Sequence, residues 1–163
     1  MGQIVTGNDI STLDAFLESH HIDYVLTGTS GLFYHGFLPK ETEAHDIDII
    51  VVPRNDEQRE EIMALLGEQE QLSGCQFDNE HYSQRVFIFK IGENNVKVNA
   101  FEGSHADIEA SRAMVINGST IRVHSVMHIL QAKLALKRPK DYEFYNKVVY
   151  QLSSMFFPQC LRK

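Results

Sequence analysis

Two aspartates, Asp46 and Asp48, are separated by one isoleucine at the start of the apolar run 46–52. Side chains alternate between the two faces of an extended strand, so both carboxylates are expected on one face and Ile47 and Ile49 on the other. Two carboxylates this close repel each other until a cation lies between them. Mg²⁺ is held by one or two carboxylates together with water and substrate phosphates. The pattern therefore predicts a magnesium site on Asp46 and Asp48.

A turn of small residues, Thr27-Gly28-Thr29-Ser30-Gly31, precedes these aspartates. Gly28 permits unusual backbone angles and close approach to a ligand. Thr29 and Ser30 offer backbone N–H groups and hydroxyls at the predicted start of a helix, where the helix dipole stabilises phosphate oxygens. Taken alone, the turn is more typical of an ordinary strand-to-helix connection, and the aspartates equally suit a polar sheet edge. Together they favour a nucleotide and magnesium site.

The spacing of apolar residues predicts an alternation of helices and strands around this pair of motifs. Three predicted helices are capped by Asn8 or Asp9, by Asn55, with an end near Gly67, and by Ser125. Two more begin at Ser30 and at Asp141, the latter after an interruption at Pro139. The predicted strands are 24–27, 46–52, 85–91 and 96–101, with a further hairpin turning at Asn117-Gly118. These elements indicate an α/β fold with a mixed β-sheet flanked by helices and with the C-terminal helices packed on the sheet.

This order of elements resembles the nucleotidyltransferase-fold superfamily, which includes small polymerase-beta-like enzymes. The resemblance covers about residues 23–152: an apolar strand, a Gly-Ser turn, a short helix, the Asp46-Ile47-Asp48 strand, a later strand that carries a third acid, and a C-terminal helix with a lysine. The implied site residues are Asp46, Asp48 and position 99 for metal and catalysis, and Gly28, Thr29, Ser30 and Lys133 for the nucleotide phosphates. Lys133 equally suits a lysine that extends from an apolar helix face into water.

One position departs from the superfamily pattern, because Asn99 stands where the third acid is usual. Asparagine can offer a carbonyl oxygen to a metal but cannot accept a proton as a carboxylate does. Glu102 follows three residues later and is expected on the opposite face of the strand. The proton of an acceptor would then need another base, for which His45, His105 or a group on a partner are candidates.

Two hypotheses for function follow from these residues. The first is a nucleotidyltransferase that binds Mg²⁺ and a nucleoside triphosphate such as ATP, and transfers a nucleoside monophosphate to a small-molecule or protein acceptor. The second is a noncatalytic nucleotide-binding or protein-interaction module that keeps the fold. This hypothesis rests on Asn99, which replaces the usual third acid. The sequence does not identify the acceptor.

Composition narrows the classes of partner. The 163 residues suit one domain, 1–163, and the formal net charge of −7 argues against general nucleic-acid binding. The polar N-terminus and the lack of a long apolar stretch favour a soluble, cytoplasmic protein without a membrane segment. Most of the eight histidines are expected to be exposed or hydrogen-bonded core residues, and their spacing does not predict a closed tetrahedral zinc site.

Overall fold

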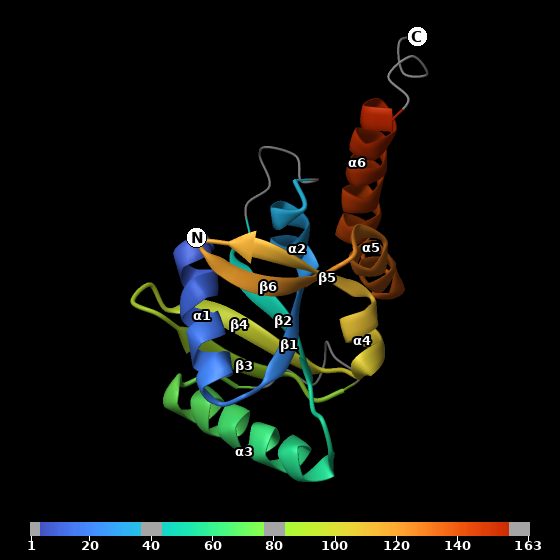
Figure 1. The fold of residues 1–163 in the computed structure, drawn as a ribbon. Helices are drawn as coiled ribbons and strands as arrows, with labels where there is room; N and C mark the ends of the chain where they lie inside the picture. The colour runs from blue at the N-terminus through green and yellow to red at the C-terminus, as the bar shows by residue number, and fades with distance from the viewer. Residues whose placement is uncertain (1–3, 37–43, 77–83, 157–163) are drawn as a thin grey trace.

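In the computed structural model, which describes residues 4–36, 44–76 and 84–156, helices pack around one mixed sheet (Figure 1). The helices are α1 Gly7–Ser19, α2 Gly28–Tyr34, α3 Asp56–Leu72, α4 His105–Glu109, α5 Val126–Ala135 and α6 Pro139–Phe156. The strands are β1 Asp23–Thr27, β2 Asp46–Val52, β3 Phe87–Ile91, β4 Val96–Glu102, β5 Ser111–Ile116 and β6 Ser119–His124.

The sheet has the strand order β3-β4-β2-β1-β6-β5. Its centre combines an antiparallel pair, β1 with β2, and two parallel pairs, β2 with β4 and β1 with β6. The two predicted hairpins form its outer parts, since β3 pairs with β4 and β5 with β6, both antiparallel. The prediction of a mixed α/β sheet is therefore confirmed.

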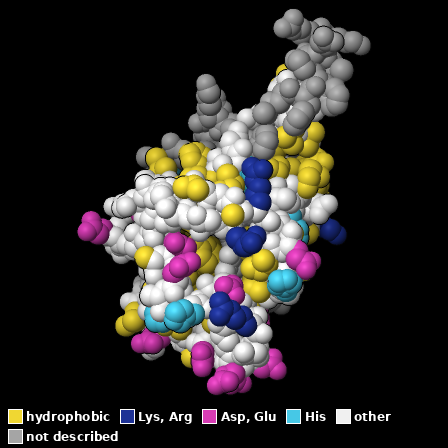
Figure 2. Space-filling model, viewed as in Figure 1, with side chains coloured by type: hydrophobic (Ala, Val, Ile, Leu, Met, Phe, Trp, Pro, Cys, Tyr) yellow, Lys and Arg dark blue, Asp and Glu magenta, His cyan; other side chains and the backbone are white. Residues whose placement is uncertain are grey.

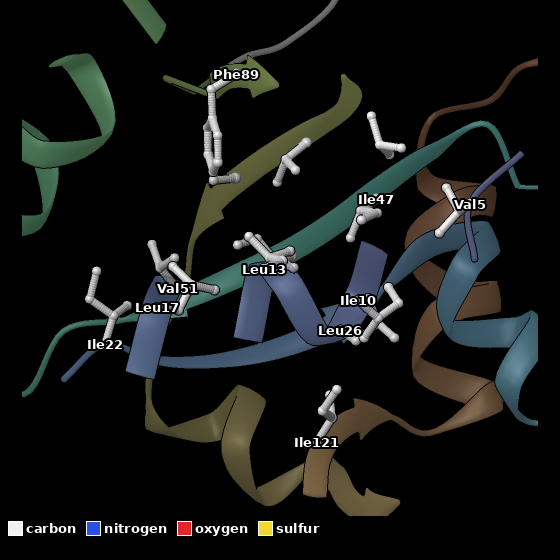
Figure 3. Close-up of a cluster of buried hydrophobic side chains, with 14 of the residues drawn as sticks. Val5, Ile10, Leu13, Leu17, Ile22, Leu26, Ile47, Val51, Phe89 and Ile121 are labelled. Carbon is white, nitrogen blue, oxygen red and sulfur yellow. The ribbon is translucent and has the colours of Figure 1, made fainter. Parts of the chain in front are cut away.

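One face of the sheet is buried under α1 and α3. Burial alternates along β2 from Asp46 to Ile50, with Ile47 and Ile49 fully buried and Asp46 and Asp48 only partly so. Figure 3 shows Leu13 and Leu17 of α1 lying against the strands that carry these apolar side chains. The period-two pattern thus sends the carboxylates to the face opposite this core.

A second apolar cluster joins α2 to the C-terminal helices. It consists of Leu32 from α2, Ile129 and Leu130 from α5, and Val148 from α6. Further along the same helices some hydrophobic side chains are exposed, and Figure 2 shows hydrophobic side chains gathered beside α5 and α6. This cluster sets where α5 lies relative to the turn before α2.

Several element ends differ from the prediction. The N-cap of α1 is Thr6, whose side chain accepts from the backbone of Asp9, so Asp9 completes a capping box and is not the cap itself. Helix α3 passes through Gly67 and ends at Leu72, because Gly74 supplies the positive φ of +68° that follows the helix end.

The C-terminal half differs in two further places. Pro139 is the first residue of α6 and does not precede it, which suits proline because the first helical N–H needs no partner within the helix. The short helix α4, His105–Glu109, was not predicted. Within the described ranges, no helix combines the length and the apolar character needed to cross a bilayer.

Candidate active site

Three neighbouring strands align one polar residue each. Asp48 on β2 lies opposite Thr27 on the antiparallel strand β1 and opposite Asn99 on the parallel strand β4. Asp46 lies two residues earlier on the same face of β2. The pairing register therefore brings the predicted aspartates and position 99 to one spot on the sheet.

Asn99 bridges the two aspartates. Its side-chain Nδ2 donates to Asp46 Oδ2 at 3.1 Å and to Asp48 Oδ1 at 2.8 Å. The residue is 4% exposed, and its Oδ1 is buried without a hydrogen-bond partner among the described residues. Glu102 lies elsewhere, paired with Arg59 on α3, as its position three residues further along the strand suggests.

The two carboxylates form an electrostatically unfavourable pair. Burial, with the neighbouring charge of Asp46, raises the pKa of Asp48 to about 6. The hydrogen bond from Asn99 and the charges of Lys133 and Lys97 act in the opposite direction but do not cancel it. Lys97 Nζ lies 3.8 Å from Asp46 Oδ2 on a half-exposed side chain. A cation beside the two carboxylates would therefore stabilise the pair.

The turn at Gly28 packs directly against Asp48. Gly28 has a φ of +67°, and a Cβ atom there would lie 2.2 Å from Asp48 Oδ2. Thr27 is the N-cap of α2, and within the described part of the chain its side chain makes no hydrogen bond to the first turn. Ser30 is buried and its hydroxyl donates to Thr27 O at 3.4 Å, which leaves its backbone N–H as the group it can offer. The turn thus presents backbone N–H groups beside the carboxylates.

Lys133 reaches this turn from α5. Its Nζ donates to Thr29 Oγ1 at 3.1 Å and lies 5.0 Å from the centre of the Phe144 ring. Burial lowers the pKa of Lys133, while the charge of Asp48 opposes that shift. Since the side chain makes a directed contact at the turn, Lys133 is not simply extended into water, which was the alternative left open by the sequence.

The oxygen-rich donor set suits a hard cation such as Mg²⁺. Asp46 and Asp48 supply carboxylate oxygens, and the unpartnered Oδ1 of Asn99 is a buried acceptor that lacks a donor. Rotation of the Asn99 amide would turn Oδ1 towards the aspartates, an arrangement that is favourable only with a cation between them. The residues present therefore fit Mg²⁺.

The predicted bases lie in different surroundings. His105 is exposed on α4, where its Nε2 lies 3.6 Å from Glu109 Oε1. His45 is exposed immediately before β2. The histidine near the turn is His124, which is not one of the predicted bases. Its Nδ1 lies 2.9 Å from Thr27 Oγ1. Its signal in the sequence is the i, i+4 pair His124 and His128.

Comparison with known proteins depends on structure alone. No protein-family model matches this chain. No curated protein sequence matches it. Three solved structures are similar to it at 15–18% sequence identity, a level at which the likeness concerns the fold.

All three similar structures cover most of the chain. An antigenic nucleotidyltransferase-like protein from Paracoccidioides brasiliensis is 15% identical, with a TM-score of 0.57 over 91% of this chain and 78% of that one. A candidate nucleotidyltransferase from Thermotoga maritima is 18% identical, with a TM-score of 0.53 over 91% of this chain and 98% of that one. The antibiotic-resistance factor ANT(2'')-Ia is 17% identical, with a TM-score of 0.53 over 94% and 92%. With this sheet, this turn and these neighbours, the protein has the nucleotidyltransferase fold.

Proposed function

We propose that this protein is a nucleotidyltransferase, which binds Mg²⁺ and a nucleoside triphosphate and transfers a nucleoside monophosphate to an acceptor. Two contacts between segments that are distant in the sequence carry the proposal. The Gly28 turn packs on Asp48, and Lys133 donates to Thr29. Phosphoryl chemistry depends on placing cations and N–H donors around phosphate oxygens, and this arrangement supplies both.

The roles of the chain's own residues follow from their positions. Asp46, Asp48 and the carbonyl oxygen of Asn99 would hold Mg²⁺. When bound, the ion supplies neutralisation of phosphate charge. Backbone N–H groups of the turn 28–30 would orient phosphate oxygens, and the Lys133 ammonium would exchange its bond to Thr29 for one to a phosphate. Position 99 is an amide, so it cannot receive the acceptor's proton as a carboxylate at that position would.

The proposed acceptor is a small molecule or a protein. The similar structure ANT(2'')-Ia is an antibiotic-resistance factor, which makes antibiotics with free hydroxyl groups the first acceptors to assay. A cytoplasmic location and a single domain over 1–163 belong to the same proposal, since Mg²⁺ and nucleoside triphosphates are cytoplasmic reagents.

A second function is favoured by one observation. Asn99 donates to both aspartates and so compensates part of their charge without a metal. A protein with this cluster could retain the fold and a nucleotide pocket without turnover, as a noncatalytic nucleotide-binding or protein-interaction module.

Binding and pyrophosphate release separate these functions. We would titrate ATP and the other nucleoside triphosphates by calorimetry with and without Mg²⁺, and then assay pyrophosphate release with antibiotic and protein acceptors. The proposal expects Mg²⁺-dependent binding that the double variant Asp46→Asn, Asp48→Asn loses, and release with at least one acceptor. Binding without release supports the noncatalytic module.

Lys133 provides a variant with a matched control. We expect Lys133→Met to weaken nucleotide binding at least about tenfold, or about 1.4 kcal/mol, because a phosphate loses its half-buried ammonium partner. Lys140→Met removes an exposed lysine near the start of α6 and should leave binding unchanged. Equal affinities for wild type and Lys133→Met would remove Lys133 from the site. Absence of any nucleotide binding to wild type would refute the nucleotidyltransferase and the nucleotide-binding module, and would leave only a protein-interaction module.

A further inference from the structure

A second cluster of metal-ligating side chains lies beside the turn, on three elements that differ from those of the aspartates. It consists of Asp107 on α4, His124 at the end of β6 and His128 on α5, and we refer to it as the His-Asp cluster. One ligand atom from each residue lies within 4.8 Å of the others. Long-range folding brings Asp107 to the histidines, while the two histidines share the i, i+4 spacing in the sequence.

The separations within the cluster suit a tetrahedral ion. His124 Nε2 lies 3.1 Å from Asp107 Oδ1, and His128 Nε2 lies 3.7 Å from the same oxygen. At metal–ligand distances of about 2.0–2.1 Å, two ligands of a tetrahedral zinc site lie about 3.4 Å apart. These two distances fall on either side of that value, and the two histidine ligand atoms lie within 4.8 Å of each other. Side-chain movements would therefore bring the three atoms around one ion.

The surroundings hold these ligands in place. His124 has a 3% exposed side chain, and its other ring nitrogen, Nδ1, contacts Thr27 Oγ1 at 2.9 Å. Asp107 uses its second oxygen, Oδ2, to accept from the backbone of Ser104 at 2.9 Å. Metal-bound histidines and carboxylates commonly use their remaining polar atoms in this way, which fixes the ligand that faces the ion.

The rings of His124 and His128 lie beside each other, and the side chain of His128 reaches the surface. The ring centroids of His124 and His128 are 4.3 Å apart, so protonation of both would place two positive charges side by side. The side chain of His128 is 41% exposed, which leaves an open route and a position for water.

We propose that Asp107, His124 and His128 bind a divalent transition metal of the zinc class, with a fourth coordination position open to solvent. Two imidazoles and one carboxylate are a donor set typical of Zn²⁺ and Co²⁺, whereas Mg²⁺ prefers oxygen ligands. The site is separate from the proposed Mg²⁺ site on Asp46 and Asp48. The His-Asp cluster is an open three-ligand site, so it differs from the closed tetrahedral zinc site that the sequence argues against.

Cobalt absorption tests the proposal on the full chain. We would titrate Co²⁺ and then Zn²⁺ into the double variant Asp46→Asn, Asp48→Asn with excess Mg²⁺ present, so that binding at the other site does not contribute. One equivalent of Co²⁺ should give the visible absorption of a low-coordinate nitrogen and oxygen site, and Zn²⁺ should displace it. We expect His128→Gln or Asp107→Asn to weaken binding by on the order of 100-fold.

Two further variants make the result decisive. His105→Gln is the matched control, because it removes an exposed histidine that also has an acidic neighbour, Glu109, but no third ligand among the residues that the structure describes. Its Co²⁺ affinity should equal that of the parent. His128→Cys keeps a ligand and should add a thiolate-to-cobalt charge-transfer band in the near ultraviolet. Far-ultraviolet circular dichroism of the metal-free variants checks folding.

Two results would overturn the proposed metal site. A parent protein without the cobalt spectrum, or one whose affinity survives both His128→Gln and Asp107→Asn, would show that these three residues form a hydrogen-bonded cluster only. Nucleotide binding is measured separately on the wild-type chain, so failure of the zinc-class site and failure of the proposed nucleotidyltransferase function are distinguishable.

Discussion

Asn99 is the residue whose side-chain chemistry most affects the proposed reaction. Its amide donates to two carboxylates that would otherwise repel each other, and aspartate at the same place would instead add a third negative charge. We expect Asn99→Asp to bind Mg²⁺ about tenfold more tightly, or about 1.4 kcal/mol, and to unfold more easily without Mg²⁺. Calorimetric Mg²⁺ titration and urea unfolding with and without Mg²⁺ measure the two effects.

The matched control for this variant is Asn94→Asp, which adds the same charge at the exposed turn between β3 and β4. This control should change neither the Mg²⁺ affinity nor the free energy of unfolding. Equal Mg²⁺ affinities for wild type and Asn99→Asp would mean that position 99 does not face the ion.

Asp48 makes stability depend on pH in an unusual direction for a carboxylate. Its folded-state pKa of about 6 lies above the ordinary value of 3.8, so the folded protein binds the proton more tightly than the unfolded chain between about pH 4 and pH 6. The stability that this group contributes is therefore fully present below pH 4 and is lost as the pH rises to about 6.

Asp48→Asn removes the loss of stability that accompanies ionisation of Asp48. In Mg²⁺-free buffer at pH 7.5 we expect the variant to have a higher free energy of unfolding than wild type, by about 3 kcal/mol at most, and the difference should disappear near pH 4. Urea unfolding of both proteins across this range measures it. A difference that is constant with pH would contradict the raised pKa.

At the scale of elements, the junction at which β1 passes into α2 depends on glycine for two reasons. Gly28 has a positive φ, and any Cβ would collide with Asp48 Oδ2. Gly118 shares the positive φ, at +82°, but has open space where a Cβ would lie. Comparison of alanine at both positions therefore separates backbone strain from the collision.

We expect Gly118→Ala to lower the free energy of unfolding by about 1–2 kcal/mol. Gly28→Ala should cost at least about 1 kcal/mol more, because Asp48 must leave its rotamer and because Asp48 Cβ, 2.9 Å from the added atom, must also shift. It should also weaken Mg²⁺ binding. Urea unfolding and Mg²⁺ titration measure these effects. Equal costs for the two substitutions would show that the contact with Asp48 is easily relieved.

Local signals explain which elements were predictable. The alternation in 46–52, the Asn55 and Ser125 caps and the turn at Asn117-Gly118 each depend on a few adjacent residues, and all appear in the structure. The end of α3 was wrong because Gly67 is tolerated inside a packed helix, and α4 was missed because five residues carry too little periodicity.

For the whole molecule, the two apolar clusters have separate consequences. Leu17 belongs to the core under α1, whereas Leu130 belongs to the cluster that holds α5, and both are at most 1% exposed. We expect Leu17→Ala and Leu130→Ala to cost about 2–5 kcal/mol each. Only Leu130→Ala should also weaken nucleotide binding, because Lys133 lies one turn further along the same helix.

Calorimetry well below both melting temperatures measures this difference on folded protein. Equal nucleotide affinities for Leu17→Ala and Leu130→Ala would show that the packing of α5 does not position Lys133.

The sequence by itself determined that Asp46 and Asp48 share one strand face, because the period of a strand is a local property of the backbone. It also indicated the turn at Gly28, since that depends on neighbouring small residues. Only the tertiary structure decided that Asn99, and not Glu102, bonds to the aspartates, and that Lys133 meets Thr29, 104 residues away. Strand register and helix packing place those residues, and neither is encoded within a short window of the chain.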